Sequence, residues 1–319
     1  MPRRRGEAQG AKPEKPSQST RHPQPQDLTR FAWLSIAAAI VTIGLKGSAW
    51  LITGSVGLLS DAAESTVNLV AAVVALVALR VAIRPPDRKH NYGHSKAEYF
   101  SAAVEGVMIF VAAAVILVAS IERFINPVAL ENVGLGLLIS VVAAVINGVV
   151  AWILIRAGNA HRSITLVADG KHLLTDVWTS VGVVVGVLLV WLTGWERLDP
   201  IIAFLVGINI LVTGWGLLRA STAGLMDVSL PVEDNARIRE IIERFTTEEI
   251  QFHAFRTREA GHRRFMEMHL LVPGAWSVKR GHDLAEDITD ALLEEYPDLR
   301  VSLHLEPIED PRSYEDIGV

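Results

Sequence analysis

The hydrophobic and polar positions divide the chain into a long apolar region and a shorter amphipathic one. From Phe31 onward, apolar segments alternate with short polar connections. Each segment is near or above the ~20 residues that a helix needs to cross a ~30 Å hydrocarbon core. The predicted segments are 31–53, 57–83, 97–122, 131–156, 165–193 and 199–222. We therefore predict an α-helical membrane protein with six transmembrane helices.

In the amphipathic region after residue 229, the spacing of apolar positions changes from one predicted element to the next. Apolar residues at helical spacing predict helices over 233–247 and 277–296. Alternating positions predict strands over 250–258, 263–273 and 300–307. The resulting order, αββαβ, predicts a small ferredoxin-like α+β domain.

Composition supports this division. Half of the 319 residues are hydrophobic and the mean hydropathy is +0.32, which is hard to reach for a soluble domain. The net charge of −5 is uneven, because residues 31–230 carry 12 basic and 12 acidic groups whereas residues 231–319 carry 11 and 20. We expect a disordered basic tail at 1–30, a transmembrane domain at 31–228, a soluble acidic domain at 229–309, and a tail at 310–319.

The distribution of cations between the connections predicts the orientation. With a cytoplasmic N-terminus, the outer connections hold only Arg123 and Arg197. The inner ones hold Arg80, Arg84, Arg88, Lys89, Lys96, Arg156, Arg162, Lys171 and Arg219. By the positive-inside rule we expect both termini and the acidic domain in the cytoplasm, and a multi-pass protein of the bacterial inner membrane.

Two predicted membrane segments carry matched polar runs, and ionisable groups at membrane depth indicate function by default. The second segment contains SDAAESTVN and the fifth ADGKHLLTD. In each run the spacing places polar residues on one helix face. Two such faces opposed would form a cage of Glu64, Asn68, His172 and Asp176. The alternative is a hydrogen-bonded cluster that only pins two helices together.

This ligand set identifies a class of metal. Two carboxylates and one imidazole suit Zn²⁺ and also permit Mn²⁺, Fe²⁺ or Co²⁺. The chain has no cysteine, which excludes disulfides, thiolate metal sites and thiol nucleophiles.

Two further groups of residues have metal-ligand chemistry. Asp87, His90 and His94 lie in the loop after the second segment and could close around a second metal, unless this is simply a solvated basic loop. In the last domain, histidines and one glutamate recur on the expected non-core face of the sheet and in its neighbours, although each could be an ordinary surface residue. These candidates are His253, His269, His282, His304 and Glu306.

Together these motifs resemble the cation diffusion facilitator family of divalent-metal/proton antiporters, over nearly all of the chain after residue 30. The resemblance also rests on the loop PDRKHNYGHSKAEYF, on LMDVSLP after the sixth segment, and on FHAFRTR, MEMHL, RGHD and LHLEP near the C-terminus. It implies a transporter rather than an enzyme, a homodimer in the lipid bilayer, and alternating access that exchanges a cytoplasmic metal ion for protons.

The resemblance also implies roles for the residues at matching positions. Glu64, Asn68, His172 and Asp176 would form the transport site, Asp87, His90 and His94 a loop site, and the five C-terminal residues a regulatory site at the dimer interface. Lys96 and Asp227 would form an interlocking salt bridge in the dimer. The family usually has Asp or His followed four residues later by Asp, where this chain has Glu64 and Asn68. We expect Zn²⁺ as substrate, with Fe²⁺, Mn²⁺ or Co²⁺ as alternatives.

A metal sensor and an intramembrane hydrolase are the two alternatives to a transporter. A membrane-anchored metal sensor without transport would share the C-terminal histidines but would not need a charged cage between helices. An intramembrane hydrolase would need a catalytic motif, and the sequence contains neither HExxH nor GxSxG. Nothing in the sequence indicates a nucleic-acid partner.

Overall fold

The computed structural model describes residues 26–53, 56–126, 133–195 and 197–315. Within its helices, the side chains of several stretches, among them 56–64 with Glu64, are not described. The described chain forms two compact units. One comprises residues 26–230 and 258–263, and the other residues 231–257 and 264–315.

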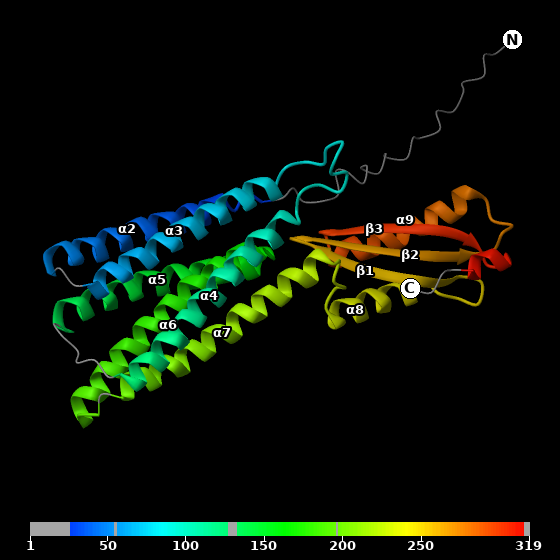
Figure 1. Cartoon of the computed structure of the whole chain (residues 1–319). Helices are drawn as coiled ribbons and strands as arrows, with labels where there is room; N and C mark the ends of the chain where they lie inside the picture. Colours follow the sequence, from blue (N-terminus) through cyan, green and yellow to red (C-terminus); the bar gives the residue numbers. More distant parts are fainter. Residues whose placement is uncertain (1–25, 54–55, 127–132, 196, 316–319) are drawn as a thin grey trace, which may run out of the picture. The chain divides into compact units, whose positions relative to one another are not determined.

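The first unit is built from long helices (Figure 1). Their bounds are α2 (Thr29–Thr53), α3 (Val56–Ala82), α4 (Ala97–Ile125), α5 (Val133–His161), α6 (Ile164–Thr193) and α7 (Leu198–Leu225). Within the described residues, four stretches are long and apolar enough to cross a membrane: Thr29–Ser48, Ala97–Ile125, Val141–His161 and Pro200–Leu225. The predicted helical membrane domain is confirmed, and membrane-crossing length is established for four of its helices.

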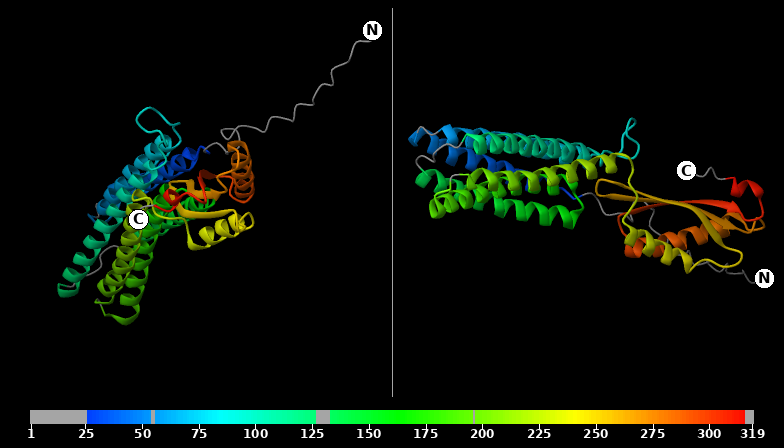
Figure 2. Two further views of the ribbon diagram at one scale, coloured as in Figure 1. Left: turned by 90° about the vertical axis from the view of Figure 1, so that its right-hand side faces the viewer. Right: turned by 60° about the horizontal axis from the view of Figure 1, so that its bottom comes forward.

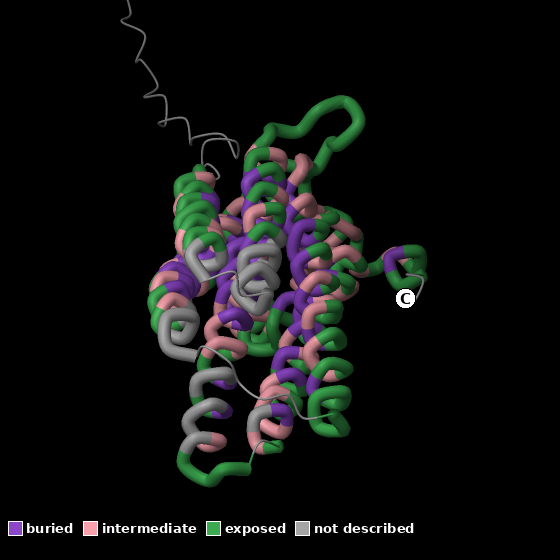
Figure 3. The backbone as a smooth tube through the Cα atoms, turned by 60° about the vertical axis from the view of Figure 1, so that its left-hand side comes forward, coloured by how far each residue is buried: buried purple, intermediate pink, exposed green. Residues whose placement is uncertain are grey.

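Helix α6 occupies the centre of this unit. It packs against α2, α3, α4, α5 and α7. Leu166 and Leu173 of α6 belong to a core shared with α2, α3 and α5, whereas Ala168 belongs to a second core shared with α4 and α7. Buried residues lie on the inner sides of the helices and exposed ones on the outer sides (Figure 3). A polar residue on the inner side of α6 is therefore surrounded by other helices.

The ends of α6 follow from local sequence. Ser163 is the N-cap, and its hydroxyl accepts a hydrogen bond from the backbone N–H of Leu166 at 3.4 Å. At the other end Gly194 adopts a left-handed conformation with φ of 69°, which glycine tolerates without steric cost.

Two glycines allow α5 and α6 to approach closely. A Cβ on Gly158 of α5 would lie 2.8 Å from the backbone nitrogen of Val167 and 3.0 Å from the carbonyl oxygen of Ser163. A Cβ on Gly170 of α6 would lie 2.7 Å from Cγ1 of Ile155. Small residues at such contacts are a usual device for packing helices in membranes, where backbones must approach for van der Waals contact.

The second unit has the predicted αββαβ order. Its elements are α8 (Val232–Glu243), β1 (Gln251–Ala260), β2 (Arg263–Val272), α9 (Val278–Glu295) and β3 (Leu299–Pro307), followed by a 3₁₀ turn, η1 (Pro311–Tyr314). The sheet order is β1-β2-β3 (Figure 1). Strand β2 pairs with β3 in parallel, so that Met266 lies opposite Val301 and His269 opposite His304. The predicted fold class is confirmed for this domain.

Helix α8 ends at Glu243, earlier than the predicted residue 247. The hydroxyl of Thr247 accepts hydrogen bonds from the backbone N–H groups of Glu249 and Ile250 at 3.3 and 3.1 Å. Such local side-chain hydrogen bonds compete with helical ones and favour a turn.

One face of the sheet is covered by α8 and α9 (Figure 2). Ile238, Ile241 and Ile242 of α8 are buried there, as are Ile288 and Leu292 of α9. On β2, Met266, Met268 and Leu270 are each 1% exposed, whereas Glu267 is exposed and His269 half-buried. This alternation of period two leaves the opposite face available for polar side chains.

Candidate metal sites

Three of the four predicted membrane ligands lie together in the helical unit. Nε2 of His172 is 2.8 Å from Oδ1 of Asn68, and Nδ2 of Asn68 donates a hydrogen bond to Oδ2 of Asp176. All three side chains are buried, with 3 to 6% exposed. We call Asn68, His172 and Asp176 the membrane cluster. Glu64 lies one turn before Asn68 on α3, and its side chain is outside the described residues.

The geometry of the membrane cluster follows from the helix period. His172 and Asp176 are four residues apart on α6, so their side chains stack on one face. Helices α3 and α6 are in contact, which brings Asn68 to that face. The matched spacing of the two sequence motifs thus becomes one polar set at the centre of the helical unit.

Two further polar side chains, neither of them predicted from the sequence, reach the membrane cluster. Asn147 of α5 donates from Nδ2 to Oδ2 of Asp176 at 3.3 Å. On α4, Oε2 of Glu105 lies 3.8 Å from Nδ1 of His172, and this residue is fully buried. The signal in the sequence was a single polar residue in the middle of an otherwise apolar segment, which is costly at membrane depth and therefore informative.

The buried charges of this unit are mostly negative. Among the described residues, its buried carboxylates are Glu98, Glu105, Asp169 and Asp176, and its buried ammonium group is Lys46. Neither oxygen of Glu105 has a hydrogen-bond partner among the described residues. A cluster that only pinned helices together would not need so many ionisable acidic groups, whereas a bound cation would be stabilised by them.

The three predicted loop residues also lie together, and we call them the loop cluster. Nδ1 of His90 is 3.3 Å from Oδ1 of Asp87, and Nε2 of His94 is 3.4 Å from Oδ2 of the same carboxylate. The two imidazole rings are 4.4 Å apart between centroids. These atoms are close enough to share one ion.

Backbone hydrogen bonds prepare Asp87 for this arrangement. The N–H groups of His90 and Lys89 each donate to its Oδ1 at 2.8 Å. These bonds lower the pKa of the Asp87 carboxyl below its usual range, so the group stays ionised at neutral pH. The loop cluster is largely open to solvent, apart from His94.

In the second unit, Glu306 of β3 lies among three imidazoles. Its carboxylate is 3.0 Å from Nε2 of His253, 3.3 Å from Nδ1 of His269 and 3.5 Å from Nε2 of His304. The pairing of β2 with β3 sets His269 directly opposite His304. We call these four residues the C-terminal cluster; His253, His269 and Glu306 are close enough to hold one ion.

The fifth predicted residue of that site, His282, is not part of the C-terminal cluster. It is exposed on α9 and makes no hydrogen bond or ion pair with the cluster in the part of the chain that is described.

The predicted pair of Lys96 and Asp227 is formed within one chain. Nζ of Lys96 is 3.0 Å from Oδ1 of Asp227 and also donates to the carbonyl oxygen of Leu225 at 3.2 Å.

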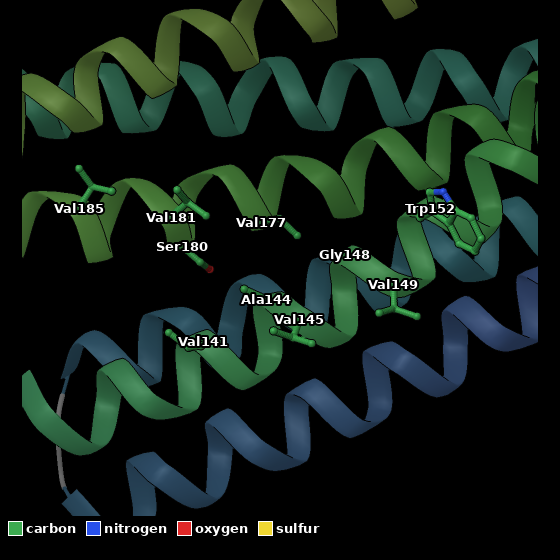
Figure 4. A pocket seen from close by; sticks show the side chains of 10 residues that line it. All are labelled: Val141, Ala144, Val145, Gly148, Val149, Trp152, Val177, Ser180, Val181 and Val185. Atoms are coloured by element: carbon green, nitrogen blue, oxygen red, sulfur yellow. The ribbon is translucent and has the colours of Figure 1, made fainter.

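An apolar groove between α5 and α6 is distinct in character from these clusters. It has a volume of about 660 Å³, and side chains of both helices line it (Figure 4). Its lining consists of Val141, Ala144, Val145, Gly148, Val149, Trp152, Val177, Ser180, Val181 and Val185. Such a surface suits hydrocarbon and offers a cation almost no ligand.

Comparisons with known proteins agree with the two-part organisation. Residues 32–226 match the model of the cation efflux transmembrane domain, and residues 230–308 match that of the cation efflux protein, cytoplasmic domain. The chain is 52% identical over 285 residues to the uncharacterized transporter sll1263 of Synechocystis, covering 89% of this chain and 92% of that protein. It is 30% identical over 275 residues to the cation-efflux pump FieF of Shewanella oneidensis, covering 86% and 92%.

Among solved structures, the zinc form of the putative zinc transporter CzrB matches with 35% identity over 25% of this chain and 90% of that chain, at a TM-score of 0.24. The two family matches cover both structural units, and the relatives are matched over most of their length. The chain therefore belongs to the cation efflux family, the cation diffusion facilitators, and is an integral membrane transporter of metal ions.

Proposed function

We propose that this transporter exports a divalent cation from the cytoplasm in exchange for protons, with Zn²⁺ as the main substrate. The observation that carries the proposal is the buried set of Asn68, His172 and Asp176 at the contact of α3 with the central helix α6. The transport site consists of this membrane cluster together with Glu64.

The donor atoms support a borderline divalent metal. Imidazole nitrogen, carboxylate oxygen and amide oxygen are ligands of Zn²⁺ and also of Fe²⁺, Mn²⁺ and Co²⁺. Asn68 supplies a neutral oxygen where the family usually has a carboxylate, which lowers the charge of the site by one. The same transporter with Fe²⁺, Mn²⁺ or Co²⁺ as main substrate is therefore the second candidate.

Exchange for protons follows from ligand chemistry. A carboxylate or an imidazole must be deprotonated to bind a metal, so metal binding and proton binding exclude each other at one site. In alternating access, the site takes the metal from the cytoplasm, opens to the other side and releases the metal as protons bind. Inward proton flow then drives export.

The proposed assembly is a homodimer in the bacterial inner membrane with both termini in the cytoplasm. The transmembrane domain spans 31–228 and the cytoplasmic domain 229–309. Metal at the loop cluster and the C-terminal cluster, together with His282, stabilises the dimer and favours the conformation that transports. The pair of Lys96 and Asp227 is the interlocking salt bridge of the proposed dimer, at the membrane surface.

Reconstitution in proteoliposomes tests the proposal. With an acidic interior, proton exit is expected to drive uptake of Zn²⁺, and an ionophore that collapses the pH gradient is expected to slow it. A series of Zn²⁺, Mn²⁺, Fe²⁺, Co²⁺ and Cd²⁺ ranks the substrates. If the protein binds these ions but moves none of them, it is a membrane-anchored sensor. Equal Zn²⁺ uptake with and without the pH gradient would contradict proton exchange.

Changing His253 and His269 together to Ala is expected to remove the stimulation of transport by cytoplasmic metal and to leave the basal rate unchanged. Both imidazoles contact Glu306, so their loss removes two donors from the C-terminal cluster. Zn²⁺ flux measured against the metal concentration on the cytoplasmic side checks this. His161→Ala, outside the cluster, is the control. Loss of all flux in the double variant would show that the cluster is needed for transport itself.

A further inference from the structure

Glu105 is a fully buried carboxylate that the proposed transport site does not use. It lies on α4, and Oε2 is 3.8 Å from Nδ1 of His172. Within the described chain, neither oxygen of Glu105 has a hydrogen-bond partner, and neither does Nδ1 of His172. The same unit also buries the carboxyl groups of Asp169 and Asp176. A buried charge in such surroundings is retained only at a cost, which calls for a function.

We propose that Glu105 is a positioning residue that fixes the orientation and the tautomer of His172 for metal binding. This inference rests on the proposed function, because it takes His172 as a ligand of the transported ion. Glu105 holds the hydrogen on Nδ1 and thereby leaves the lone pair of Nε2 for the metal. Carboxylate–histidine–metal arrangements of this kind are common in metal sites, where the outer partner orients the ring and raises its basicity.

The two nitrogens of His172 face different partners, and this geometry supports the role. Nε2 is 2.8 Å from Oδ1 of Asn68, which can only accept, so without a metal Nε2 donates a hydrogen to that oxygen, whereas Nδ1 faces Glu105. A metal bound between Nε2 and Oδ1 takes the place of this hydrogen. A neutral imidazole carries its proton on one nitrogen, and a metal on Nε2 requires that proton on Nδ1. A movement of about 1 Å brings Oε2 of Glu105 from its present distance to that of a hydrogen bond with Nδ1.

The same geometry argues against Glu105 as a ligand of the same ion. A metal held by Nε2 of His172 and a carboxylate facing Nδ1 lie on opposite sides of one ring. Glu105 acts on the metal through His172.

A double-mutant cycle with His172 tests the proposal. The affinity for Zn²⁺ is measured on the full chain in detergent, in a parent whose loop-cluster and C-terminal-cluster histidines are Ala, so that binding reports the membrane site. Glu105→Met, similar in size but without a carboxylate, is expected to raise Kd by about 10- to 100-fold. Glu105→Gln retains an acceptor oxygen for Nδ1–H and is expected to recover most of this loss.

The cycle separates a positioning role from a general structural one. In a His172→Asn parent, Glu105→Met is expected to change Kd less than about twofold, because the residue has nothing left to orient. Glu98→Gln is the control, since Glu98 is a buried carboxylate of the same helix whose side chain contacts Ser163 rather than His172. If Glu105→Met does not fold, the Gln variant alone is compared in both parents, with a smaller loss expected only where His172 is present.

Three results would overturn the inference: an unchanged Kd in a folded Glu105→Met protein, an equal loss in both parents, or an equal loss in the Glu98→Gln control. The proposed function fails separately if the parent binds no Zn²⁺ at the membrane cluster, or if Asp176→Asn leaves that binding intact. Where Asp176→Asn abolishes binding and Glu105→Met does not weaken it, only the positioning role is wrong.

Discussion

Asp176→Asn is expected to lower Zn²⁺ flux in proteoliposomes by more than about 100-fold, since changes to partners outside the ligand shell alone cost about 10- to 100-fold. Asp176 is a buried carboxylate in contact with Asn68 and Asn147, on the helix that touches all the others of its unit. The substitution keeps the shape of the side chain and removes its negative charge. A divalent cation taken out of water then loses a charged ligand that no neutral group replaces.

The control for this variant is Ser180→Ala, one turn further along α6, where the side chain lines the apolar groove. Ser180 is half-buried, and its hydroxyl donates to the backbone carbonyl of Asp176 at 2.9 Å, not to the carboxylate. We expect its loss to leave flux within about twofold, because it removes no ligand. Size-exclusion chromatography of both variants shows whether fold and dimer are intact. His172→Ala gives a second test and is also expected to abolish flux. Normal flux in a folded Asp176→Asn protein would show that the membrane cluster is not part of the transport path.

Gly158→Val is expected to destabilise the helical unit by about 3 kcal/mol or more, at the upper end of the cost of overpacking a core. The first added carbon would lie 2.8 Å from the backbone nitrogen of Val167 and 3.0 Å from the carbonyl oxygen of Ser163. Neither backbone atom can move away without shifting the start of α6. Because α6 carries His172 and Asp176, we expect lower Zn²⁺ affinity together with the loss of stability.

Heating of the purified protein in detergent, followed by chromatography of the remaining monodisperse fraction, measures this effect. Gly216→Val is the matched control, because a Cβ on that exposed glycine of α7 meets no atom within 4 Å. Valine is also a better helix former than glycine, so the control is expected to keep or raise stability. Equal stability of the two variants would mean that α5 and α6 do not require close contact at Gly158.

The sequence predicted the elements well because each has a strong local signal. The apolar segments of the helical unit are long, and each lies between polar connections or turn residues. In the C-terminal domain, the change from period two to helical spacing marks each strand and helix, and the order αββαβ limits the possible sheets. Two helix ends differ by several residues from the prediction: α5 continues to His161, past the predicted 156, and α8 ends at Glu243, before the predicted 247. At α8 the side chain of Thr247 accepts backbone hydrogen bonds and favours a turn.

The candidate sites were predictable in proportion to how local they are. Asp87, His90 and His94 lie within eight consecutive residues, so one loop brings them together. His172 and Asp176 share a helix face through their spacing of four. The place of His282 was less predictable, because it depends on how α9 packs on the sheet, and in one chain it lies apart from Glu306.

The sequence by itself determined the class of this protein: apolar segments that must lie in lipid, an acidic α/β domain, and runs of His, Asp, Glu and Asn at helical spacing that suit metal ions. Only the tertiary structure decided which helices surround those runs. It placed α6 at the centre of its unit and brought Asn147 from α5 and Glu105 from α4 to the membrane cluster. Helical periodicity specifies the face on which a side chain lies, whereas its neighbours from other helices depend on packing between segments far apart in the chain.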